Sequence, residues 1–158
     1  MRALTLALAL ALAAWAGRAQ ANPYNVSEVP KLIDGGTATR LHALGIHMTD
    51  QLLGQAATAG DRKRLARSTG LRGARIEQMA RQADLLRLMN IGPEFVILLE
   101  ATGVRSIPDL ATRDAATLTR KATALNRARH LAHPGPTEAQ VRDWIAQSRK
   151  LPAVLFPG

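Results

Sequence analysis

The stretch Leu88-Met89-Asn90-Ile91-Gly92-Pro93-Glu94 decides the fold, because it joins two helical patterns through a turn of only a few residues. Before it, residues 73–88 carry apolar side chains at three- and four-residue spacing, which predicts an amphipathic helix. After it, Pro93 suits the first position of a helix that runs to Thr102 and ends at Gly103. The stretch therefore predicts two helices held at an angle by a tight turn.

Glycine, proline and capping residues divide the rest of the chain beyond residue 22 into further short helices. Ser27, Asp61 and Asp114 are predicted N-caps, because their side chains can accept bonds from backbone N–H groups. No segment alternates apolar and polar residues with a period of two, and the apolar residues are mainly Ala and Leu, which favour helices. We therefore predict an all-α domain, with further helices over residues 27–33, 37–44, 49–56, 61–69, 114–125 and 136–151 and one that begins at Ser106.

The pattern around the central turn occurs twice in the chain. Placing Ile33 opposite Ile91 without gaps pairs similar residues: Leu41 with Leu99, Ala43 with Ala101, Gly45 with Gly103, Ile46 with Val104 and Leu52 with Leu110. Matched glycines favour a true repeat, since glycine answers a specific need of the backbone. We predict a first unit over residues 26–60, a second over 61–130 with its turn at 89–93, and a C-terminal helix over 136–151.

A helix, a short turn of the Gly-hydrophobic-Gly-Pro type and a second helix form the helix-hairpin-helix motif, which residues 88–94 resemble. Asn90 replaces the usual first glycine, and Asn tolerates a left-handed backbone better than most residues. The run from Ala83 to Val104, followed by Leu110–Arg113, Ala124–Asn126 and Val141–Ile145, resembles the bacterial domain-of-unknown-function 4332 family. This resemblance implies a bundle of tandem helix-hairpin-helix (SAM-like) units.

The resemblance to helix-hairpin-helix proteins that bind DNA implies a phosphate site, in which turn amides and the next helix N-terminus face the phosphate. The candidate residues are Arg87 and the backbone of Asn90, Ile91 and Gly92. Glu94 lies in the first turn of that helix and Asp34 lies at the first turn of the repeat, so both carboxylates would repel a phosphate. The alternative is that both turns only fix the angle between their helices.

The positive charge of the 158-residue chain is uneven. Its 21 Lys and Arg against 12 Asp and Glu give a net charge of +9, and residues 61–87 hold eight of the cations against three acids. Arg64, Arg67, Arg72 and Arg75 have the spacing of a basic stripe, which with Arg87 forms a candidate surface for nucleic acid or another anion. The alternative is an ordinary solvated helix face. The segment holds no aromatic residue, so nothing favours base stacking.

The N-terminus has the pattern of a secretory signal peptide. Arg2 precedes an apolar stretch, Ala3–Ala16, interrupted only by Thr5, and Ala19-Gln20-Ala21 forms an A-x-A site. The stretch is too short to cross a hydrocarbon core of ~30 Å. We predict cleavage after Ala21, a location in the periplasm or outside the cell, and no membrane span afterwards.

Signals for catalysis are few. The absence of cysteine excludes disulfides, thiol nucleophiles and Cys-ligated metals. His130 and His133 are three residues apart, but Pro134-Gly135-Pro136 follows at once and neither a carboxylate nor a third histidine adjoins them. The sequence has no G-x-S-x-G pattern, phosphate-binding loop or dinucleotide fingerprint. We predict a protein that is not an enzyme and has no cofactor or metal.

These observations favour an exported, non-enzymatic binding or scaffolding module of the helix-hairpin-helix type. Its expected partner is a protein or another polyanion in the cell envelope. The alternative is sequence-independent DNA binding in the periplasm, through the turn backbone and the basic helix.

Overall fold

Eight α-helices form the fold in the computed structural model, which describes residues 23–156. A short 3₁₀ helix, η1 (Val26–Glu28), precedes them. Their bounds are α1 (Gly35–His42), α2 (Thr49–Gln55), α3 (Ala59–Thr69), α4 (Gly73–Leu85), α5 (Pro93–Ala101), α6 (Ile107–Ala111), α7 (Ala115–Arg129) and α8 (Glu138–Ser148). Over these residues there is no strand, which confirms the all-α prediction. The predicted signal peptide, residues 1–21, lies outside the described part.

Local sequence signals set the start of most helices. Helix α5 begins at Pro93, and the side chain of Asp114 caps α7 as predicted. The side chain of Ser106, where the sequence predicts that a helix begins, caps α6. Thr137 caps α8, where the side chain of Gln140 bonds back to the cap backbone. Each of these side chains satisfies an N–H group that has no partner inside its helix.

Two predicted caps are wrong. Asn25 caps η1, and Ser27 lies inside that short helix, where its N–H donates to Asn25 Oδ1 at 3.0 Å. Thr58 caps α3, and Asp61 is the third residue of the helix, where its carboxylate accepts the N–H of Thr58 at 3.0 Å. In both cases a suitable side chain two or three residues upstream takes the role.

The chain leaves α1 and α5 in the same way. The N–H of Ile46 donates to the Leu41 carbonyl at 3.0 Å, and that of Val104 donates to the Leu99 carbonyl at 3.1 Å. The glycine before each β-branched residue has a positive φ, 75° in the first copy and 95° in the second. The left-handed glycine turns the chain so that the next residue enters the core, where Ile46 and Val104 are fully buried.

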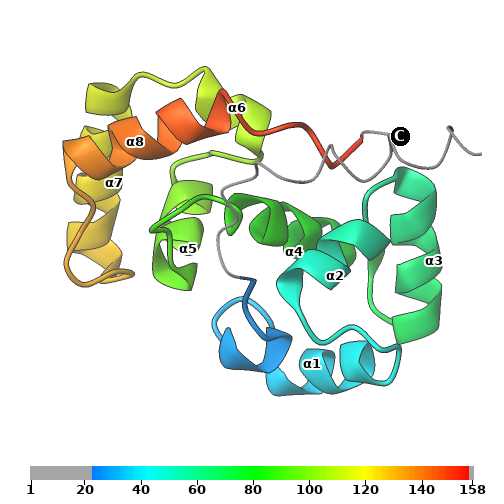
Figure 1. The fold of residues 1–158 in the computed structure, drawn as a ribbon. Coiled ribbons are helices and arrows are strands. Elements are labelled where there is room, and N and C mark those ends of the chain that lie inside the picture. Colours follow the sequence, from blue (N-terminus) through cyan, green and yellow to red (C-terminus); the bar gives the residue numbers. More distant parts are fainter. Residues whose placement is uncertain (1–22, 157–158) are drawn as a thin grey trace, which may run out of the picture.

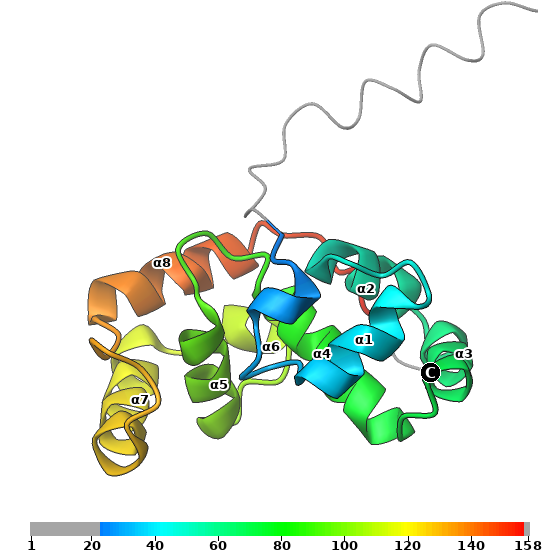
Figure 2. The ribbon, with the colours of Figure 1, turned by 90° about the horizontal axis from the view of Figure 1, so that it is seen from below.

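The repeated unit consists of four helices. Helices α2 and α3 pack on α4, and α6 and α7 pack in the same way on α8. Figure 1 shows α1–α4 on one side of the molecule and α5–α8 on the other. Seen from below, α4, the last helix of the first group, lies near the centre of the molecule (Figure 2). Helices α1–α4 are called the first unit and α5–α8 the second unit, and the predicted bounds of 26–60 and 61–130 stay a prediction.

One hydrophobic core joins the two units, and the C-terminal segment ties them together on the outside. Trp144 of α8, whose ring lies 5.1 Å from that of Phe95, belongs to the same buried cluster as Leu41 and Ile46 of the first unit. After α8 the chain crosses back to the first unit (Figure 1), where the N–H of Phe156 donates to the Ala57 carbonyl at 2.9 Å. Arg62, 9% exposed, donates to the Phe156 carbonyl at 2.9 Å and completes this strap.

Replacing Gly103 by alanine should lower the free energy of unfolding by about 1–2 kcal/mol, because an L-residue is disfavoured at its φ of 95°. Gly54→Ala is the matched control: a Cβ at either position meets no atom within 4 Å, but Gly54 lies in α2. There alanine should leave the stability unchanged or raise it. Urea unfolding of both variants measures the difference, and an equal loss at both sites would contradict the proposed turn geometry.

Candidate anion-binding surface

The first turn of the repeat has a carboxylate of its own at the helix N-terminus. Asp34 caps α1, and its carboxylate accepts the N–H and the hydroxyl of Thr37 at 2.9 and 2.8 Å. These two bonds lower the pKa of the Asp34 carboxyl, and Arg75 at 3.8 Å contributes less. The place where a phosphate would meet the helix dipole is therefore taken by this chain's own anion.

The second turn adopts the predicted backbone and also has an acid beside it. Asn90 has a φ of 58°, in the left-handed region that its side chain tolerates. Gly92 caps α5 without a side-chain bond, and a Cβ on it would lie 3.4 Å from Glu94 Oε2. The N–H of Glu94 itself and Lys31, 3.1 Å from Oε1, lower the pKa of the Glu94 carboxyl. Ile91 is buried, and its carbonyl accepts the Tyr24 hydroxyl at 3.2 Å.

Two of the five candidate arginines are committed to internal bonds. Arg75 donates to the Leu32 carbonyl at 2.6 Å and to Gln78 Oε1 at 2.9 Å. Arg87 lies 2.6 Å from the carboxylate of Asp84 and donates to the Pro152 carbonyl at 3.0 Å. Both side chains therefore join distant parts of the chain, and the structure does not bring them together as one outward stripe.

The other three candidates are exposed. Arg64 on α3 pairs with Asp61, which neutralises much of its charge. The side chains of Arg67 on α3 and of Arg72, the cap residue of α4, make no hydrogen bond or ion pair within the described part of the chain. The pairs Arg64–Arg67 and Arg72–Arg75 thus belong to two different helices.

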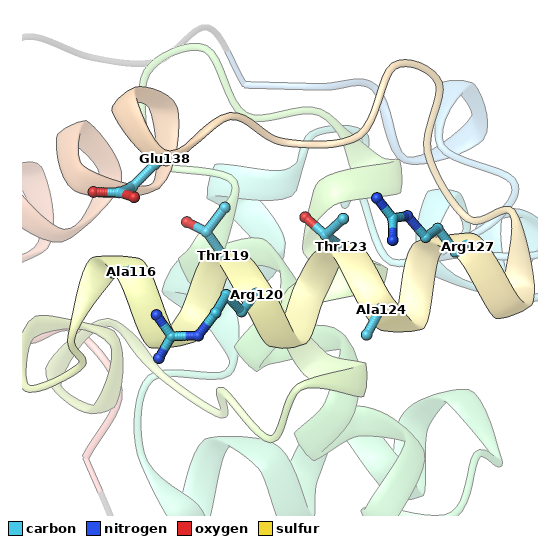
Figure 3. Close-up of a pocket in the computed structure, with 7 residues that line it drawn as sticks. All are labelled: Ala116, Thr119, Arg120, Thr123, Ala124, Arg127 and Glu138. Atoms are coloured by element: carbon cyan, nitrogen blue, oxygen red, sulfur yellow. The ribbon is translucent and has the colours of Figure 1, made fainter.

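Sequence reasoning missed a hollow of about 460 Å³ along α7, called here the α7 groove. Figure 3 shows its lining, which includes Thr119, Arg120, Thr123, Ala124 and Arg127 from α7 and Glu138 from α8. Arg127 has no bonded partner within residues 23–156, and Arg120 donates only to the Thr117 hydroxyl at 3.0 Å. The available sequence signal was two arginines seven residues apart, with small residues between them, on one predicted helix.

Comparison with protein families identifies the chain. The family described as Domain of unknown function (DUF4332) matches residues 33–151, which include all eight helices from α1 to α8.

This chain belongs to the DUF4332 family. The match covers both four-helix units, so the repeat lies within the family's domain. Neither the curated proteins nor the solved structures contain a significant match.

The two histidines that lie three residues apart, His130 and His133, do not share a helix turn in this DUF4332 domain. His130 ends α7 with a φ of 51°, and both His130 and His133 are exposed. Among the described residues, no group of three or more His, Asp or Glu side chains could hold a metal ion. Over the same residues no helix has both the length and the apolar character needed to cross a bilayer.

Arg87→Met should lower the free energy of unfolding by about 3 kcal/mol at neutral pH, because Asp84, 2% exposed, would lose its cation. Burial already raises the pKa of the Asp84 carboxyl, with Arg87 opposing that shift. A carboxyl group whose pKa is raised in the folded protein makes that protein less stable as the pH rises through this pKa. The loss of Arg87 costs stability only where Asp84 is ionised, so the penalty of Arg87→Met should shrink in acid.

The double variant Asp84→Asn with Arg87→Met is the control, since a neutral amide needs no cation. Unfolding measured from pH 4 to 7 should show the double variant as more stable than Arg87→Met at neutral pH. A loss that is the same at every pH and is not relieved by Asp84→Asn would contradict this role of Arg87.

Proposed function

We propose that this DUF4332 domain is an exported, non-catalytic binding or scaffolding module of the tandem helix-hairpin-helix type. Its turns act as structural elements, and its partner is a protein in the cell envelope. The signal-peptide pattern of residues 1–21 supports export. Removal of that segment takes away Arg2 and Arg18 and leaves 19 Lys and Arg against 12 Asp and Glu, and this net charge of +7 supports a partner with an anionic surface.

The observation that carries this proposal is the pair of carboxylates at the helix N-termini. Asp34 is bonded to the backbone of α1, and Glu94 lies beside Gly92 at the start of α5 and is paired with Lys31. Phosphate binding at either turn would require the carboxylate to leave and its favourable interaction with the helix dipole to be lost. This arrangement supports a role for both turns in fixing helix angles.

The internal bonds of the basic segment support the same conclusion. Arg62, Arg75 and Arg87 donate to backbone carbonyls of distant segments, at Phe156, Leu32 and Pro152. Much of the charge that predicted a nucleic-acid surface therefore holds the fold together. DNA binding remains the alternative, and it would depend on Arg64, Arg67 and Arg72, which are exposed.

A duplex DNA titration separates the two functions. The purified protein should show no binding of a labelled duplex at about 50 mM salt, because only a few phosphate contacts are open to it. Electrophoretic mobility shift and fluorescence anisotropy would measure this. Duplex binding that falls steeply with salt, and that is lost when Arg64, Arg67 and Arg72 are all changed to Glu, would overturn the proposal in favour of DNA. Arg87 is left unchanged, because its loss would disturb Asp84.

Export has its own test. Mass spectrometry of the native protein from the envelope fraction should find an N-terminus at Asn22, the residue after the A-x-A site. An N-terminus at Met1, with the protein in the cytosol, would contradict the proposed location.

A further inference from the structure

Helices α3 and α7 begin in equivalent ways. Thr58 caps α3 by accepting the N–H of Asp61 at 3.1 Å. Asp114 caps α7 by accepting the N–H of Thr117 at 2.8 Å. Each helix begins on the residue after its cap and packs on the last helix of its own unit. The two caps therefore fix a residue-by-residue correspondence between the helices.

The correspondence exposes a change of charge between the two units. Six residues after each cap stands an arginine, Arg64 in α3 and Arg120 in α7, and each bonds to the side chain three residues before it. In α3 that side chain is the Asp61 carboxylate, whereas in α7 it is the Thr117 hydroxyl. The hydroxyl leaves the charge of Arg120 in place. Asp114 is the nearest acid on the same helix, and its carboxylate is bonded to the backbone.

The hollow beside this arginine is larger in the second unit. Arg64 and Ser68 line a hollow of about 200 Å³, and their counterparts Arg120 and Ala124 line the α7 groove of about 460 Å³. In the first unit Leu44 and Gln55 form part of the lining. The second unit therefore combines a larger hollow with an arginine that forms no ion pair within residues 23–156, although the Asp114 carboxylate attracts it without direct contact.

Figure 3 shows how the groove is arranged. Thr119, Thr123 and Arg127 lie along one edge of α7 in this view, and Arg120 and Ala124 lie along the other edge, with Arg120 nearer the start of the helix and Arg127 nearer its end. Glu138 lies across from Thr119, and its carboxylate is paired with Arg142 at 2.6 Å. Seven residues of helix separate the arginines by about 10 Å, close to the span of three residues of an extended peptide.

We propose that the α7 groove binds an extended acidic segment of the partner protein, an inference that rests on the proposed function. Arginine pairs with carboxylates through two parallel bonds. The Thr119 hydroxyl donates to the Ala115 carbonyl at 2.7 Å and can accept a peptide N–H group, and the Thr123 hydroxyl can bond to the peptide backbone as well. Glu138, whose carboxylate is paired with Arg142, can still accept a peptide N–H group. No aromatic residue lines the groove, so a single-stranded nucleic acid finds no stacking surface.

The test is the binding of fluorescein-labelled decaglutamate to the purified protein, measured by fluorescence anisotropy. Changing Arg120 and Arg127 together to Glu should weaken binding at least about tenfold, since both attractive charges become repulsive. The matched control changes Arg67 and Arg72 to Glu. These residues are also exposed and unpaired in the described structure, so the net charge changes equally. The affinity of the control for decaglutamate should stay within about threefold of the wild-type value, because the changed charges are distant from the groove and are screened by salt.

The outcomes separate the groove from the proposed function. Equal losses of decaglutamate affinity in both double variants, or a loss in the control alone, would contradict binding at the α7 groove. The proposed binding function would stand, with its surface elsewhere on the protein. A wild-type protein that binds neither decaglutamate nor duplex DNA would also contradict the proposal that the α7 groove binds an acidic segment. A wild type that binds duplex DNA and not decaglutamate would overturn the proposed function itself. Circular dichroism of both variants should show wild-type helix content, since all four side chains are exposed.

Discussion

The left-handed glycine after α1 and after α5 is the constraint on which the rest of the fold depends. At each one the carbonyl of a buried leucine, Leu41 or Leu99, accepts two backbone N–H groups at 3.0–3.1 Å. This closes the helix and sends the following β-branched residue into the core. The next helix then starts three residues later and packs on the last helix of its unit. Because the chain has no cysteine, these turns and the shared core must provide its stability.

The two copies keep this frame and differ in how they use charge. In the first unit Arg62 holds the C-terminal strap and Arg75 reaches the Leu32 carbonyl, while the exposed Arg64 pairs with Asp61, and Arg67 and Arg72 are exposed without lining either hollow. In the second unit Arg120 and Arg127 face solvent beside a groove. Duplication of a unit allows this division, since one copy can secure the fold while the other presents a surface.

Much of the fold could be predicted from the sequence, because its signals are local. Pro93, Ser106 and Asp114 act on the helix that each begins, and the matched glycines indicated the repeat. The candidate site was less predictable. The partners of Arg87 and Arg75 include carbonyls 65 and 43 residues away, and no spacing rule reveals such bonds. The α7 groove depends on the packing of α7 on α8, which the sequence pattern does not specify.

The central claim is that both turns are structural and that the second unit carries the binding surface. Backbone amide shifts in ¹⁵N–¹H correlation spectra, recorded as decaglutamate is added, test it most directly. We expect progressive shifts for the amides of residues 116–127 and of Glu138, while the amides of residues 35–37 and of Gly92, Glu94 and Phe95 stay unmoved. Shifts concentrated at residues 35–37 and at Gly92, Glu94 and Phe95, with α7 unaffected, would show that the turns bind the anion and would contradict the account.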